Sequence, residues 1–294
     1  MRRMALYFLS AVMTSLIAST ATAPFVLFHF QQMPTYSILA NVIAVPLMAF
    51  VIMPSAVLAL FLMPLGVEYG ALQVMGFGIT QVLEIAHWFA DVPGGVAKVP
   101  VYPVFGLVLF VLGGLVLILW RGRLKAVSVV FFVFAFGILF FHRSYDVLVS
   151  SEFNLVMFRD DAGAFHISSR RAERFSAENW ESSYGLDEGT ARRWEKEGGD
   201  DGFSCDDQAC RAVVKQQNFS FLRDPYALQI ECSWADVVVS FDVLDGAACG
   251  GDAVVLDWLS GMRNGSYGFW VDGDAVRYEA ANDLRGRRPW VVRN

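Results

Sequence analysis

The chain has 294 residues, 55% of them hydrophobic, and a mean hydropathy of +0.44. A composition this apolar excludes an ordinary soluble globular domain. Charge is also divided unevenly, because residues 1–142 hold 6 of the 23 basic and 3 of the 29 acidic residues, about +3, against −9 for the remainder. The sequence therefore predicts a helical membrane domain over 1–142 and an acidic, water-facing domain over 143–294.

Four apolar segments occur in the first half. Residues 4–23 are long enough to cross about 30 Å of hydrocarbon. Residues 36–64 are apolar but interrupted by prolines, and 103–120 and 126–142 are clean apolar runs. A secretory signal peptide is the alternative for the N-terminus, since a basic start, an apolar run and "ASTATA" follow one another. The further apolar segments directly after it favour a retained span.

Three positive charges within "RGRLK", residues 121–125, separate the last two segments. The positive-inside rule places this loop in the cytoplasm and predicts a multi-pass inner-membrane protein with a periplasmic C-terminal domain. If the N-terminus also lies inside, one full crossing by 36–64 leaves residue 103 on the wrong side. Either 36–64 is re-entrant and turns back at its prolines, or 67–91 crosses as well; we favour re-entry.

Residues 67–91 predict an amphipathic helix. Its polar positions are spaced 7, 4, 3 and 4 apart and form one stripe: Gln73, Thr80, Glu84, His87 and Asp91. Such a helix either lies flat in the membrane interface or lines a polar cavity.

Polar side chains also occur within or beside the apolar segments, where they are costly and usually face an interior or a water-filled path. The candidate passage-lining residues are therefore His29, Gln31, Asn41, Gln73, Thr80, Glu84 and His87. A competing interpretation is that Asn41 satisfies backbone freed by proline, and that His29 and Gln31 lie among lipid headgroups.

The second half predicts a small β-rich α+β domain. Alternating and β-branched residues indicate strands at 146–150, 154–159, 164–169, 235–241, 252–257, 267–272 and 275–280. Helices are predicted at 175–185, with Ser176 as the N-cap, and at 189–199, ending at a pair of glycines.

All four cysteines, Cys205, Cys210, Cys232 and Cys249, lie in this half. An even count in an exported domain favours two disulfides, and of the three possible pairings we favour the local one, 205–210 with 232–249. Zinc is the alternative, although the spacing of the cysteines is poor for it.

The stretches "TAPFVLFHFQQM", "ILANVIAVPLMAFVIMPSAVLALFLMPLG" and "GITQVLEIAHWFADVPGG" resemble the competence domain of the ComEC family over about residues 5–142. This resemblance implies an inner-membrane channel that imports single-stranded DNA during natural transformation, with other competence proteins as partners. Homo-oligomerisation stays open. The N-terminal extracellular domain and further spans of that family are missing here, so a shortened form is expected.

The second half resembles a degenerate metallo-β-lactamase-like tail. A two-metal hydrolase site needs clustered ligands, whereas the nearest two of the four histidines, His142 and His166, are 24 residues apart. We therefore expect no enzyme, no cofactor and no metal. Arg285, Arg287 and Arg288 form a basic cluster that is a candidate DNA-phosphate contact. The alternative function is a membrane-anchored structural or interaction protein with a disulfide-stabilised outer domain.

Overall fold

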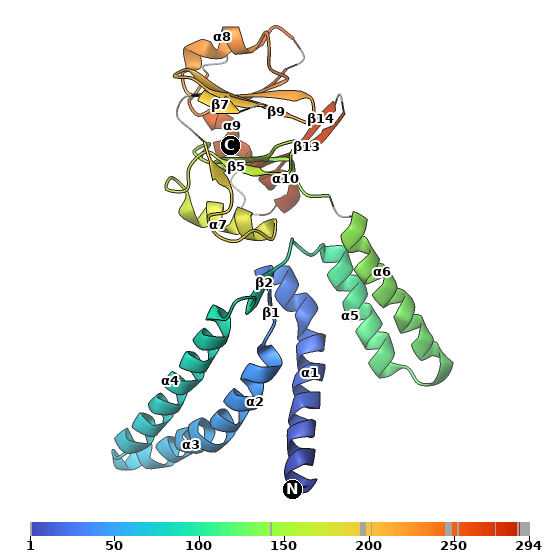
Figure 1. Ribbon diagram of the computed structural model, residues 1–294, viewed down its shortest axis with the longest axis vertical. Helices are drawn as coiled ribbons and strands as arrows, with labels where there is room; N and C mark the ends of the chain where they lie inside the picture. The colour runs from blue at the N-terminus through green and yellow to red at the C-terminus, as the bar shows by residue number, and fades with distance from the viewer. Residues whose placement is uncertain are drawn as a thin grey trace. The chain divides into compact units, whose positions relative to one another are not determined.

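Figure 1 shows a computed structural model of the chain, which describes residues 2–141, 143–194, 198–200, 202–244, 249–251, 253–273, 275–286 and 288. The chain divides into two compact units, Met1–His142 and Arg143–Asn294. The described part of the first unit is helical apart from a short two-stranded ribbon, and the second is rich in β-strand.

The first unit follows one chain order. Its elements are α1 (Arg2–Phe30), β1 (Gln32–Pro34), α2 (Ser37–Leu47), the π-helix η1 (Met48–Ile52), α3 (Met53–Leu62), the 3-10 helix η2 (Met63–Leu65), α4 (Tyr69–Asp91), β2 (Val96–Lys98), α5 (Val104–Leu119), the 3-10 helix η3 (Gly122–Ala126) and α6 (Val127–Phe141).

The proline-rich segment stays helical from Ser37 to Leu65, which differs from the expectation that it turns back at its prolines. Pro46 lies near the end of α2, and the π-helical turn that follows takes up the backbone bond that proline cannot make. Pro54 lies in the first turn of α3, where no backbone donor is lost. The chain reverses only at Gly66, whose φ of +66° glycine adopts without strain.

The two ends of this helical hairpin meet again. β1 pairs with β2 in antiparallel register, Gln32 opposite Lys98 and Pro34 opposite Val96. The Val99 N–H also donates to the Gln31 carbonyl over 3.0 Å. α4 therefore returns to where α2 began, so that α5 starts near the end of α1 rather than at the far end of the hairpin.

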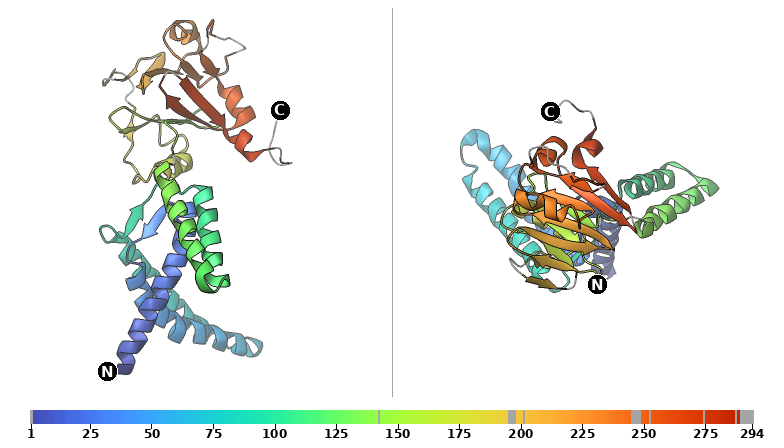
Figure 2. Two further views of the ribbon diagram at one scale, coloured as in Figure 1. Left: turned by 90° about the vertical axis from the view of Figure 1, so that its right-hand side faces the viewer. Right: turned by 90° about the horizontal axis from the view of Figure 1, so that it is seen from above.

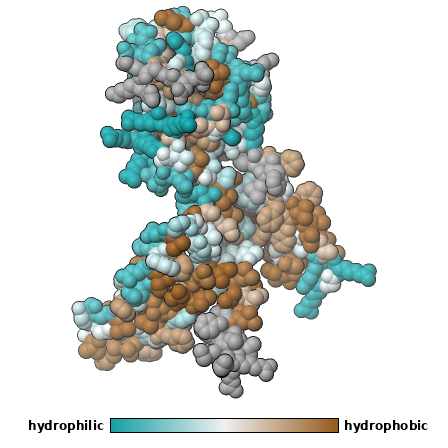
Figure 3. Space-filling view, in the orientation of Figure 1, coloured by the Kyte–Doolittle hydropathy of each residue, from teal (hydrophilic) through white to brown (hydrophobic). Residues whose placement is uncertain are grey.

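Two helical segments are long and apolar enough to cross a membrane, judged by length and composition: Val12–Phe30 and Ser37–Leu65. Val104–Leu119 is a shorter apolar helix. Large hydrophobic side chains are exposed along the described helices, with Phe61 at 75% and Ile118 at 78%, and Figure 3 shows the resulting apolar surface over this unit. Water-soluble monomers rarely expose so much contiguous apolar surface.

Two six-stranded sheets form the second unit. The first has the order β14 (Ala275–Ala280), β13 (Tyr267–Asp272), β3 (Val147–Val149), β4 (Val156–Arg159), β5 (Phe165–Ile167), β6 (Arg192–Arg193). The second has the order β12 (Val254–Leu256), β11 (Val237–Ser240), β10 (Gln217–Leu222), β9 (Ala209–Val214), β8 (Phe203–Cys205), β7 (Gly198–Asp200).

The sheets pack face to face, with helices on their outer sides (Figures 1 and 2). Phe158 and Phe269 of the first sheet and Phe219 of the second lie in the core between them. α7 (Arg174–Ser183) covers the outer face of the first sheet. α8 (Leu228–Glu231) covers the outer face of the second. Two further short helices, α9 (Trp258–Asn264) and α10 (Ala281–Arg285), flank β13 and β14.

Both disulfides join the cysteines in the predicted local pairing. Cys205 and Cys210 are bonded across the register of β8 and β9, where they lie directly opposite each other. Cys232 and Cys249 are bonded across a sequence separation of 17 residues.

The predicted helix at 189–199 is wrong over its described residues. Arg192 and Arg193 form β6, which pairs in parallel with β5, and Gly198 begins β7; residues 195–197 lie outside the described residues. The charged pattern suited a helix, but partners remote in sequence supply backbone bonds to an extended chain instead. α7 is present, although its N-cap is Glu173 rather than Ser176.

Candidate functional site: the polar face of helix α4

Helix α4 packs closely against the segment before it. Ala71 and Gly78 are its buried residues, seven positions apart and therefore on one face. A Cβ atom added at Gly78 would lie 2.8 Å from the Ile52 side chain and 3.2 Å from that of Val51. Absence of a side chain at Gly78 thus lets the two helices of the hairpin approach.

The polar stripe lies on the opposite face of α4. Gln73 and Thr80 each follow a buried position by two residues, which corresponds to a rotation of about 200° around the helix. Gln73, Thr80, Glu84 and His87 are all exposed. The structure therefore brings the four predicted residues together on one face, but the stripe points away from the packed face of the hairpin.

Hydrogen bonds within α4 satisfy part of this stripe. The Thr80 hydroxyl donates to the Gly76 carbonyl over 3.1 Å, and the Gln81 amide donates to Glu84 over 3.0 Å. Gln73 and His87 make no side-chain hydrogen bond to another described residue. These two side chains therefore have polar groups available to water, headgroups or a polar ligand.

Gln31 has a structural role that the sequence did not reveal. Its φ is +51°, its side-chain amide donates to the Phe28 carbonyl over 2.7 Å, and its own carbonyl accepts the Val99 N–H. These bonds end α1 and hold the β1–β2 ribbon to it. His29 is exposed in the last turn of α1, with its ring edge-on to Phe28 at 5.0 Å.

Asn41 is half-buried in α2, and its side chain forms no hydrogen bond to any other residue that the structure describes. The backbone-repair interpretation therefore has no bond to support it. No hydrogen bond or ion pair among the described residues joins Asn41, His29 or Gln31 to the stripe of α4. The seven candidates consequently occupy separate places within the first unit.

Sequence reasoning missed Glu68, the N-cap position of α4. One of its carboxylate oxygens, Oε2, is buried without a hydrogen-bond partner among the described residues. The start of a helix favours negative charge because its free N–H groups point outward. The available signal was isolation, since Glu68 is the first charged residue after Arg3.

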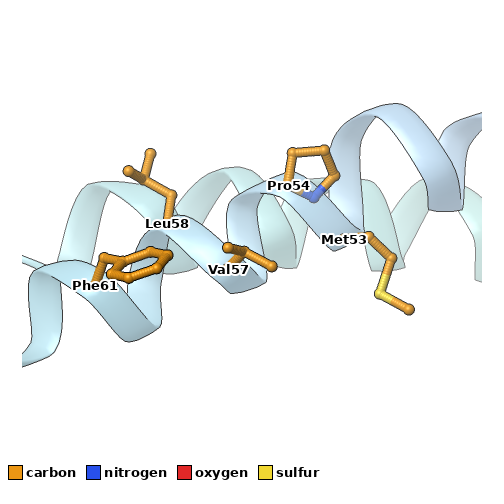
Figure 4. A pocket seen from close by; sticks show the side chains of 5 residues that line it. All are labelled: Met53, Pro54, Val57, Leu58 and Phe61. Carbon is orange, nitrogen blue, oxygen red and sulfur yellow. The ribbon is translucent and has the colours of Figure 1, made fainter.

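A hollow on α3 is wholly apolar and forms no part of a polar path. It measures about 490 Å³ and is lined by Met53, Pro54, Val57, Leu58 and Phe61. Figure 4 shows these side chains along one side of the helix. A surface with this lining suits hydrocarbon chains.

The arginine cluster of the second unit is only partly described. Arg285 is exposed in the last turn of α10 and Arg288 is exposed beyond it, whereas Arg287 lies outside the described residues. No group of three or more His, Cys, Asp or Glu side chains in the described part of the chain is placed to hold a metal ion.

Comparison with known families identifies the first unit. Residues 2–124 match the family described as "Competence protein". No curated protein and no solved structure matches the chain.

Proposed function

Since residues 2–124 belong to the competence protein family, consistent with a ComEC-family protein, we propose that this chain is a non-enzymatic component of the channel that imports single-stranded DNA during natural transformation. The family match supports a role in DNA uptake. The channel role is our extension of it to the polar face of α4.

The observation that carries the channel role is the exposed stripe opposite the hairpin contact. Gln73 and His87 have free polar groups in an otherwise apolar helical unit, and Thr80 lies between them. Polar groups at membrane depth are retained where they face water or another polar surface. A path for DNA would therefore run along the outer face of α4, not between α4 and the α2–α3 segment.

The proposed topology has η3 in the cytoplasm and the second unit in the periplasm. Arg121, Arg123 and Lys125 are exposed in the turn between α5 and α6, where the positive-inside rule applies. The β1–β2 ribbon supports this arrangement, because it returns the chain to the end of α1 before α5 begins. Both disulfides lie in the second unit, as an oxidising compartment favours.

The test is uptake of end-labelled DNA into a nuclease-protected cytoplasmic pool. Cells that carry Gln73→Leu in place of the wild-type gene should lose most of this pool, because leucine removes the polar group and keeps the helix. The matched control is Val74→Leu, which introduces the same side chain at the neighbouring position outside the stripe. Equal uptake by both variants and wild type would count against the channel role.

The alternative is a membrane-anchored structural or interaction protein, and the two disulfides of the second unit favour it specifically. Under this alternative, Gln73→Leu and Asn41→Leu leave uptake unchanged, whereas changes on the surface of the second unit reduce it. The same uptake assay therefore separates the two functions.

A further inference from the structure

Strand β14 forms an unusually long open edge in the second unit. It has six residues, whereas the other three edge strands of the two sheets, β6, β7 and β12, have two, three and three. Among the described residues it pairs on one side only, with β13. Natural proteins usually keep edge strands short, because a free edge is a template for another strand.

One hydrogen bond establishes which backbone groups of β14 point outward. The Ala281 N–H donates to the Ser266 carbonyl over 2.8 Å, continuing the ladder in which Ala280 lies opposite Tyr267. Hydrogen-bonded and non-bonded pairs alternate along an antiparallel ladder. The N–H and C=O groups of Val276, Tyr278 and Ala280 are therefore directed away from β13, at the open edge.

The side chains at this edge divide between two faces. Val276 and Ala280 belong to the core between the sheets. Tyr278 packs beside them, 5.8 Å from the ring of Phe269, yet remains 48% exposed. Arg277 and Glu279 lie on the opposite face, since side chains alternate along a strand.

Self-pairing of this strand is decided by charge. An outward residue can bond only to another outward residue, so the two-fold antiparallel registers with more than one bonded pair are centred on 277, 278 or 279. A centre at 277 places Arg277 opposite Arg277, and a centre at 279 places Glu279 opposite Glu279. A centre at Tyr278 places Arg277 opposite Glu279 twice and forms about six backbone hydrogen bonds, the most of the three.

We propose that two copies of this chain associate through β14, antiparallel about a two-fold axis at Tyr278, so that the first sheets of the two copies become one continuous sheet. Such an interface is self-complementary, as two-fold symmetry requires. The half-exposed ring of Tyr278 would be covered by its counterpart in the other copy, which extends the core across the axis.

Cysteine cross-linking in membranes of cells that express the full chain distinguishes the three registers. All four native cysteines are bonded, so an introduced cysteine supplies the free thiol. Co-expression of differently tagged Arg277→Cys and Glu279→Cys chains should give a disulfide-linked heterodimer, because directly opposed non-bonded pairs have Cα atoms about 4.5 Å apart. Each variant alone should give no linked dimer, since its own counterpart lies two residues out of register.

A charge exchange tests the same interface without cysteines. Glu279→Arg places arginine opposite arginine on both sides of the axis and should weaken dimerisation of the detergent-solubilised chain roughly tenfold. The double variant Arg277→Glu/Glu279→Arg restores opposite charges and should recover most of the lost affinity.

Three results would overturn the proposal. They are a chain that stays monomeric at the highest concentration reached, cross-linking by either single cysteine variant alone, and capture of the edge cysteines by a different protein. None of these results bears on DNA uptake, so the interface and the proposed function are tested independently.

Discussion

Glu231 is a charged residue that belongs to the interior of the second unit. It is 2% exposed, and its carboxylate accepts hydrogen bonds from the Arg211 guanidinium and from the Ser220 hydroxyl at 2.8 Å. A buried carboxylate is retained when its partners replace the hydration it loses. α8 is thereby bound to the outer face of the second sheet through charge as well as apolar contact.

Glu231→Leu should destabilise the second unit by about 3 kcal/mol, because Arg211 and Ser220 lose their partner. The double variant Arg211→Met/Glu231→Leu should cost less than the single one, since no unpaired charge remains. Urea unfolding of the detergent-solubilised chain, followed by tryptophan fluorescence, measures both. A double variant less stable than Glu231→Leu would contradict this account.

Asp206 gives the second unit a dependence on acid pH. Backbone N–H groups of Ala209 and Gln208 donate to its carboxylate at 2.7 and 2.8 Å. The bond from Ala209 is the main cause that holds the pKa of Asp206 below its ordinary 3.8. A lowered pKa in the folded state stabilises the fold fully above about pH 3.8, and this contribution is lost as the pH falls through the lower folded-state value.

Asp206→Asn should therefore be less stable than wild type near pH 6, with the difference shrinking toward pH 2. The asparagine oxygen can still accept the two backbone bonds, so the turn between Cys205 and Cys210 is kept. Thermal unfolding midpoints of the solubilised chain between pH 2 and 6 provide the measurement. A difference that stays constant with pH would show that titration of Asp206 is not the cause.

At the scale of elements, the α3–α4 hairpin depends on one missing side chain. Gly78→Ala should destabilise the helical unit by about 1–2 kcal/mol, because the new methyl group overlaps Ile52. Gly76→Ala is the matched control, since a Cβ atom there meets nothing within 4 Å and alanine is the better helix former. Thermal unfolding in detergent should lower the midpoint for the first variant and leave or raise it for the second.

For the whole molecule, the proposed topology places the two ends of α6 on opposite sides of the membrane. A membrane-impermeant maleimide applied to cells with a permeabilised outer membrane should label Glu152→Cys, which is exposed in the second unit, and not Lys125→Cys in η3. Lysis of the inner membrane should then expose Lys125→Cys to the reagent. Labelling of Lys125→Cys in intact cells would reverse the orientation.

Much of this architecture could be predicted from local patterns. Apolar length and the spacing of Gln73, Thr80, Glu84 and His87 predicted the helices and the stripe, because a helix repeats its faces every 3.6 residues. Alternation predicted strands such as those beginning at Tyr267 and Ala275. Spacing also favoured the pairing of the cysteines. These features depend on neighbours in sequence, so the sequence by itself determined them.

Other features depended on contacts between residues distant in sequence. The sequence could not show that Gly66 rather than a proline reverses the hairpin, that Gly78 turns the stripe of α4 outward, or that Arg192 and Arg193 pair with β5. Each outcome depends on which partner supplies a backbone bond or fills a space, and partners are chosen only when the chain packs. The sequence therefore determined which residues of α4 form a polar face, and the tertiary structure decided where that face points.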